Sequence, residues 1–216
     1  MDDLAWNPFD ALSAEQRQQL NAFEEMLCQF NDRVNLISPE TEGEFRTRHL
    51  LHCLTLTARD FPSGSTIVDW GTGGGLPAIP LAICYPDVTV VGVDSVGKKG
   101  RAVRTMARRL DLDNCYAWTG RAAEWEGEAH FSLSRATAPL AELWAWHRRV
   151  AIPLDAISGD ETWAPGLLAL KGGDLNDEIA ALRETDPAVD VERLSLGSVL
   201  GRNGFFGEKE IVAVWS

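Results

Sequence analysis

The spacing of apolar residues divides the chain into a helical N-terminal part and a longer part in which strands and helices alternate. Apolar residues recur at helical spacing between residues 14 and 34, which predicts an amphipathic helix there. Ser13 and Gln16 have the form of a capping box at its start. A second apolar-rich segment predicts a helix over about 43–60. We therefore expect residues 1–60 to form a helical extension ahead of the main sheet.

From residue 66 onward, short apolar runs alternate with helix-like segments. The strands are predicted at 66–71, 88–94, 115–120, 131–134 and 167–171. The helices between them are predicted at 76–85, 97–111, 138–151 and 174–184. Two further strands, 189–196 and 210–215, are expected to form an antiparallel pair. This alternation is typical of an α/β fold with a doubly wound, mostly parallel, seven-stranded sheet. We expect residues 61–216 to form that core and the whole chain, 1–216, to be a single domain.

Composition and charge restrict the possible functions. No apolar run approaches the ~20 residues of a membrane span, and the acidic N-terminus lacks a secretion signal pattern. The four cysteines are scattered, without a C-x-x-C pair, as in a reduced cytoplasmic protein. The net charge of −12 predicts general repulsion from phosphate. Any nucleic-acid binding must therefore rest on a local basic patch.

A glycine-rich turn follows the first predicted strand and carries the clearest chemical signal. Its spacing is Asp-x-Gly-x-Gly-x-Gly, from Asp69 to Gly75. The dinucleotide fingerprint would need a further glycine at position 76, where this chain has Leu76. Asp94 ends the second strand, where a carboxylate can accept hydrogen bonds from ribose hydroxyls. Because ligands of doubly wound sheets bind at the carboxyl ends of the strands, these residues predict a nucleoside site.

The same turn resembles motif I of class I S-adenosylmethionine-dependent methyltransferases, which have a Rossmann-like fold. More specific segments narrow the resemblance, and they occur in the order Asn35–Ser38, Arg48-His49, Gly71–Leu81, Asp94–Lys99, Ser134–Ala136 and Ala169–Gly172. Together they are similar to the bacterial RsmG (GidB) family of small-subunit rRNA guanine-N7 methyltransferases. The resemblance implies that S-adenosylmethionine is the cofactor, and that 16S rRNA or the 30S ribosomal particle is the substrate. We expect a cytoplasmic monomer that does not bind a membrane.

The resemblance also assigns roles to individual residues. The cofactor contacts that it implies are Asp69, Gly71, Gly73, Leu76, Asp94, Ala123, Glu124 and Arg135. Ala123 and Glu124 follow the third strand, where the adenine is expected. The chain departs from the family pattern at His52-Cys53, where an Asp-Ser pair is usual. It also departs near the C-terminus, where the family tends to be basic but Lys209 lies between Glu208 and Glu210.

Guanine N7 has a lone pair and no proton to lose, so its methylation needs no general base. Catalysis should come from aligning N7 with the methyl group. We take Arg135 and Lys171 as the candidate catalytic residues, since an arginine can donate to guanine O6. A structural ion pair is the alternative role for both. We expect no metal site.

A run of basic residues predicts the RNA-binding face. No acid interrupts the chain between Asp94 and Asp111, and this stretch carries Lys98, Lys99, Arg101, Arg104, Arg108 and Arg109. Arg101, Arg104 and Arg108 share one helical stripe. A merely solvated face is the alternative. Two other functions also stay open: a non-catalytic S-adenosylmethionine-binding module that docks to RNA or protein, and a small-molecule methyltransferase.

Overall fold

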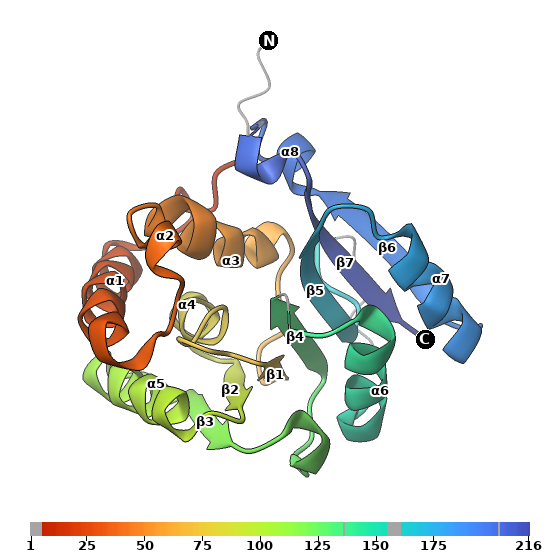
Figure 1. Ribbon diagram of the computed structural model, residues 1–216, viewed down its shortest axis with the longest axis horizontal. Coiled ribbons are helices and arrows are strands. Elements are labelled where there is room, and N and C mark those ends of the chain that lie inside the picture. The colour runs from red at the N-terminus through yellow and green to blue at the C-terminus, as the bar shows by residue number, and fades with distance from the viewer. Residues whose placement is uncertain (1–5, 136, 155–160, 203) are drawn as a thin grey trace.

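The computed structural model describes residues 6–135, 137–154, 161–202 and 204–216 (Figure 1). Seven strands form one sheet in the order β3-β2-β1-β4-β5-β7-β6. Their bounds are β1 Thr66–Trp70, β2 Thr89–Asp94, β3 Cys115–Thr119, β4 Phe131–Arg135, β5 Gly166–Gly172, β6 Asp190–Ser195 and β7 Lys209–Trp215. Strands β1 to β5 are parallel, and β7 is antiparallel to both of its neighbours. The predicted doubly wound sheet and its antiparallel C-terminal pair are confirmed.

Helices cover both faces of the sheet, and each face has its own apolar cluster. Buried side chains of α1 (Ala14–Val34), α4 (Ala78–Cys84) and α5 (Gly97–Arg109) share one cluster. Those of α6 (Leu140–Val150) and α7 (Asn176–Thr185) share the other. The predicted capping box of α1 is present, since the Ser13 hydroxyl accepts from the Gln16 N–H and the Gln16 side chain accepts from the Ser13 N–H.

The helical segment expected over about 43–60 is present, but it is not one regular α-helix. After the short α2 (Pro39–Glu42), the chain forms a π-helix η1 (Arg46–Leu51), then α3 (His52–Leu54) and a 3₁₀ turn η2 (Thr55–Ala58). Every residue from His49 to Leu56 is buried, so this segment has no single apolar stripe that would favour a regular α-helix. The Thr55 and Thr57 hydroxyls donate to carbonyls three residues back, which favours the tight final turn.

The C-terminal part closes one side of the sheet. Short helices α8 (Leu196–Val199) and η4 (Gly204–Phe206) join β6 to β7 and pack near α3 through Phe206 and His52. A further 3₁₀ turn, η3 (Ala122–Glu124), follows β3. Residues 155–160, between α6 and β5, lie outside the described residues, as does Ala136 of the family segment after β4. No described helix has both the length and the apolar character needed to cross a bilayer.

Candidate active site

The turn between β1 and α4 brings its backbone close to the carboxyl ends of the strands. Gly71 adopts φ +73°, and its N–H donates to the Val93 carbonyl on β2 (2.8 Å). A Cβ atom at Gly71 would collide with the Thr137 side chain, whose hydroxyl donates to the Trp70 carbonyl (2.9 Å). Only glycine satisfies both the positive φ and this close approach.

Asp94 connects this turn to the end of β2. Its Oδ2 accepts from the Gly73 N–H (3.0 Å) and its Oδ1 accepts from the Val96 N–H (2.8 Å). Each carboxylate oxygen keeps further acceptor capacity, so the same side chain can also receive ribose hydroxyls. Asp94 thus shapes the turn and presents a negative charge at its edge.

A cleft of about 790 Å³ lies beside these two features. It is lined by Gly71, Val93, Asp94, Ser95, Gly120, Arg121, Ala122, Ala123, Glu124, Thr137, Glu142 and Trp146. Four of the predicted cofactor residues therefore share one wall: Gly71, Asp94, Ala123 and Glu124. The size is that of small-molecule sites in general, and a carboxylate beside a glycine turn suits a nucleoside. These residues fit S-adenosylmethionine.

Sequence reasoning missed Thr137, Glu142 and Trp146. Trp146 carries the one signal that could have indicated it. The buried residues of α6 are Leu140, Leu143, Trp144, His147 and Val150, and Trp146 lies off that stripe. A tryptophan outside the apolar face of a helix is a candidate for a ligand-facing wall.

Asp69, Leu76 and Gly73 do not line the cleft. Asp69 is fully buried and its Oδ2 accepts from the Ala78 N–H (3.2 Å) at the start of α4. Burial raises the pKa of Asp69 to about 6, against the opposing effects of the Thr72 hydroxyl and the Ala78 N–H. The Leu76 side chain is buried in the core. Asp69 and Leu76 therefore support the turn from within.

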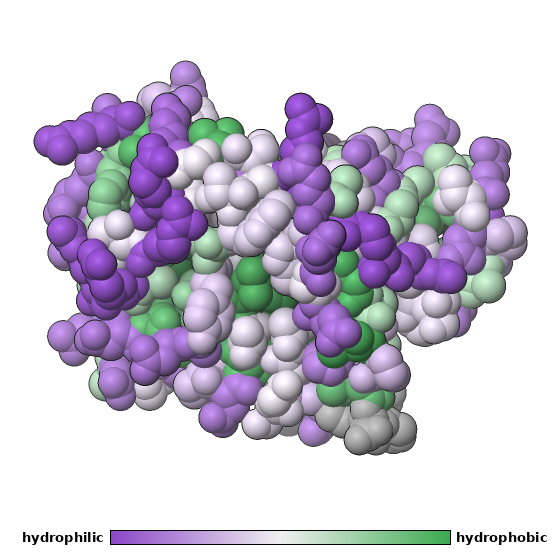
Figure 2. Space-filling model, turned by 90° about the horizontal axis from the view of Figure 1, so that it is seen from below, coloured by the Kyte–Doolittle hydropathy of each residue, from purple (hydrophilic) through white to green (hydrophobic). Residues whose placement is uncertain are grey.

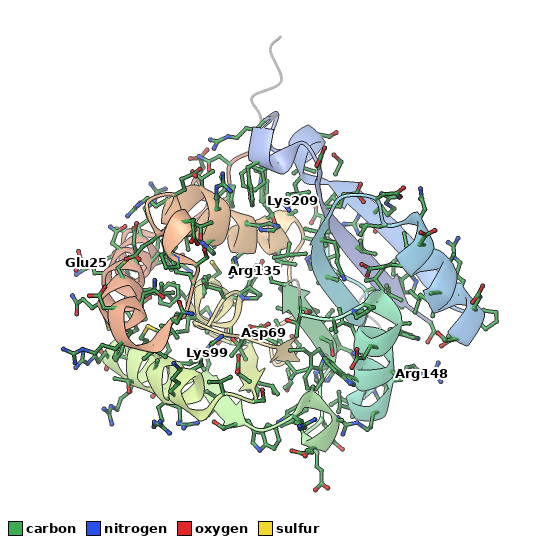
Figure 3. The ribbon with its side chains drawn as sticks, viewed as in Figure 1. Glu25, Asp69, Lys99, Arg135, Arg148 and Lys209 are labelled. Atoms are coloured by element: carbon green, nitrogen blue, oxygen red, sulfur yellow. The ribbon has the colours of Figure 1, made fainter. Side chains whose placement is uncertain are left out.

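A second pocket of about 400 Å³ adjoins the cleft, because Thr137 lines both. It lies at the carboxyl ends of β4 and β5 and is lined by His52, Arg135, Thr137, Ala138, Pro139, Leu170, Lys171, Gly172, Glu178 and Lys209. Figure 3 shows Asp69, Arg135 and Lys209 following one another across the middle of the molecule. Arg135 lies in this pocket and not among the residues that line the cleft.

Arg135 is held by a histidine from the π-helix. Its Nη1 lies 2.8 Å from His49 Nδ1, and His49 Nε2 lies 2.8 Å from Thr41 Oγ1. A guanidinium only donates, so Nδ1 is the acceptor and the ring hydrogen is on Nε2. Burial, with the charges of Arg135 and Arg48, lowers the pKa of His49 to about 4. His49 is therefore neutral, and the charge of Arg135 stays uncompensated by this contact.

Lys171 lies in the same pocket, but its charge is paired. Its Nζ is 2.8 Å from Glu178 Oε2 and donates to the Ala138 carbonyl (2.8 Å). The side chain is only 10% exposed. Lys171 thus ties β5 to α7 and to the segment after β4.

The predicted basic face lies on α5, which begins three residues after Asp94. Five of its six cations are exposed and Lys99 is half-buried; none forms an ion pair with a described carboxylate. Arg104 donates to the Ala117 carbonyl (2.9 Å), while Arg101 and Arg108 extend from the same stripe. Figure 2 shows hydrophilic side chains gathered over the side where α1 and α5 lie. Among the described residues, no three His, Cys, Asp or Glu side chains are grouped so that they could hold a metal ion.

The strand order, the glycine turn after β1 and the acid that ends β2 define a class I S-adenosylmethionine-dependent methyltransferase. Solved structures show the same fold. Magnesium protoporphyrin IX methyltransferase from Synechocystis, with bound S-adenosylmethionine, matches 95% of this chain and 99% of its own, with a TM-score of 0.59 and 16% identity. Aeropyrum pernix fibrillarin, in complex with S-adenosylmethionine, matches 78% of this chain and 75% of its own, with a TM-score of 0.56 and 16% identity.

Sequence comparison gives the family. The family model described as rRNA small subunit methyltransferase G (GidB) matches residues 16–203. The Ribosomal RNA small subunit methyltransferase G of Salinibacter ruber is 74% identical over the whole of both chains, and that of Chlorobaculum tepidum is 38% identical over 87% of this chain and 83% of its own. The chain belongs to this family. It is an S-adenosylmethionine-dependent methyltransferase of small-subunit rRNA, as the sequence resemblance predicts.

Proposed function

We propose that this methyltransferase acts on N7 of a guanine in 16S rRNA, on naked rRNA or on the 30S particle, as a cytoplasmic monomer. The observation that carries the proposal is the junction of two cavities. The cleft beside Asp94 meets the pocket of Arg135 at Thr137. A cofactor in the first cavity and a base in the second would meet at that junction.

In this proposal, different residues of the cleft contact different parts of the cofactor. Asp94 binds the ribose hydroxyls, Gly71 brings the backbone close, and Ala123 and Glu124 face the adenine. Gly73 is a cofactor contact whose N–H is fixed by Asp94. Asp69 and Leu76 act from behind the turn by holding its shape. When bound, S-adenosylmethionine supplies an electrophilic methyl group on a sulfonium.

The second pocket binds and aligns the guanine. N7 attacks through a lone pair, so this chain does not need to remove a proton, and the pocket residues contribute by orientation. Arg135 donates to O6 of the base, a recognised arginine–guanine contact. Its positive charge does not favour charge build-up on the purine, so its role is alignment. Lys171 acts one step further away, through Glu178 and the carbonyl of Ala138.

The proposed RNA face is the exposed side of α5, with the cations Lys98, Lys99, Arg101, Arg104, Arg108 and Arg109. Lys98 and Lys99 lie in the first turn of that helix, close to the Asp94 edge of the cleft. Because the net charge is −12, RNA docking must use this local patch and not the protein as a whole. The extension (1–60) and the core (61–216) act as one domain, since α1 contacts both α4 and α5.

The test is methyl transfer from labelled S-adenosylmethionine to three acceptors. These are 30S subunits that lack the modification, protein-free 16S rRNA, and guanosine monophosphate. We expect label in N7-methylguanosine from at least one of the two rRNA acceptors. Label in guanosine monophosphate alone would indicate a small-molecule methyltransferase, and label in none of the acceptors would indicate a docking module. Either result would contradict the proposal.

A further inference from the structure

Lys209, the first residue of β7, has a side chain held in one place at the second pocket. It pairs with Gly172 across the antiparallel strands. A Cβ atom at Gly172 would lie 2.6 Å from Lys209 Nζ and 2.8 Å from its Cδ, so the lysine side chain crosses directly over that glycine. The ammonium also lies 5.2 Å from the centre of the Phe205 ring. Such a contact holds a lysine head group near the ring face.

The ammonium of Lys209 forms no ion pair with a described carboxylate, although glutamates precede and follow it in the sequence. Glu210 points to the other face of β7, as neighbours on a strand do, and Arg193 binds both of its oxygens (2.6 and 2.9 Å). No carboxylate among the described residues lies within ion-pairing distance of Lys209. The two flanking acids therefore leave its charge uncompensated.

The other cations around Lys209 differ in whether a carboxylate compensates their charge. Lys171 is paired with Glu178 (2.8 Å). Arg48, which lies 5.3 Å from the same Phe205 ring, is paired with Glu44 (2.9 Å). Arg135, which lines this pocket, is hydrogen-bonded to the neutral His49 behind it, and no described carboxylate forms an ion pair with it. Lys209 and Arg135 thus leave two net positive charges on one small pocket (Figure 3).

We propose that Lys209 binds a phosphodiester group of the rRNA strand, next to the target guanine, at the rim of the Arg135 pocket. The inference deepens the proposed function and rests on it. A neutral base needs hydrogen bonds, which Arg135 can donate, but it does not need a second cation. A base that enters the pocket brings the phosphates of its own nucleotide with it. A lysine serves such a group as a point charge.

The test measures binding of the S-adenosylhomocysteine-loaded protein to 30S subunits that lack the modification, across a range of salt concentrations. Lys209→Met should weaken binding about 5- to 8-fold at 0.1 M salt and should reduce the slope of log K against log[salt] by about 0.7–0.9, the effect of one phosphate contact. Lys209→Arg should restore most of both values. The matched control is Arg183→Met, which removes an exposed charge on α7 that lines neither pocket; it should leave the slope unchanged.

A second variant tests the placement of the charge and not only its presence. Gly172→Ala keeps Lys209 but occupies the space that its side chain crosses, so binding should weaken as in Lys209→Met, with unchanged affinity for S-adenosylmethionine. Wild-type affinity in both variants would overturn the inference. That result is distinct from failure of the proposed function, in which the wild-type protein itself forms no N7-methylguanine.

Discussion

Replacing His49 separates the positioning of Arg135 from every other role of this histidine. His49 contacts Arg135 through Nδ1 and Thr41 through Nε2, both at 2.8 Å. The amide of asparagine reaches the place of Nδ1, whereas that of glutamine reaches the place of Nε2. We therefore expect His49→Asn to keep Arg135 in position and His49→Gln to release it.

The magnitude follows from the kind of contact. A hydrogen bond to a charged group contributes about 1.5–3 kcal/mol, and about 1.4 kcal/mol corresponds to a tenfold change in rate. If Arg135 aligns the base, His49→Gln should lower kcat/KM about 10- to 150-fold. His49→Asn should stay within about threefold of the wild type. Thr41→Val removes the Nε2 partner, together with the hydrogen bond from the Thr41 hydroxyl to the Ser38 carbonyl, and leaves Nδ1 of His49 in place, so it serves as the control for packing in this segment.

The assay is steady-state methylation of 30S subunits that lack the modification, with S-adenosylmethionine affinity measured separately. The affinity for cofactor should be the same in all variants, because His49 lies in neither cavity lining. Equal losses in His49→Asn and His49→Gln would refute the positioning role. Full activity in Arg135→Ala would refute the role of Arg135 itself.

Three further results are expected. Gly71→Ala should abolish measurable S-adenosylmethionine binding in calorimetry, since a Cβ atom there collides with Thr137 and the positive φ disfavours alanine; binding within threefold of the wild type would show that the turn can adjust. Arg101→Glu with Arg108→Glu should weaken rRNA binding and flatten its salt dependence at unchanged cofactor affinity; an unchanged salt slope would mean that the stripe is only solvated. In urea unfolding, stability should fall as the pH drops from 6.5 toward 4, by about 1.4 kcal/mol per pH unit for each of three histidines whose pKa burial lowers to about 4, 3 and 4, namely His49, His52 and His147. Asp69, whose pKa burial raises to about 6, acts in the opposite sense below pH 6, so a net gain of stability on acidification would contradict these assignments.

The alternation of strands and helices was sufficient to predict the sheet, because each element buries its apolar face locally. The glycine turn and Asp94 were also predictable, since their positions depend on the ends of two neighbouring strands. The change of helix type within residues 46–58, from π-helix to α-helix to 3₁₀ turn, was not predictable from the sequence. There the apolar and polar residues are buried together, and tertiary contacts of His49 with Arg135, 86 residues away, replace the local pattern.

The charged residues next to a lysine in the sequence did not indicate which groups it pairs with in the structure. Lys209 lies between two acids in the sequence, yet strand alternation turns Glu210 away from it toward Arg193. Lys171 lies near the end of a central strand, where a catalytic residue is expected, yet its ammonium donates to the carboxylate of Glu178 and to the carbonyl of Ala138. Such pairings depend on which strand lies next to which, and the order β5-β7-β6 cannot be read from local spacing.

The central claim is that a guanine of 16S rRNA receives the methyl group on N7. N7-methylation makes the purine ring sensitive to borohydride, and aniline then cuts the strand at that nucleotide. After incubation of 30S subunits that lack the modification with this protein and S-adenosylmethionine, we predict a single new cut in the 16S rRNA, absent when the cofactor is omitted and strongly reduced with Arg135→Ala. If the 16S rRNA gains a methyl group but shows no such cut, methylation at guanine N7 is contradicted.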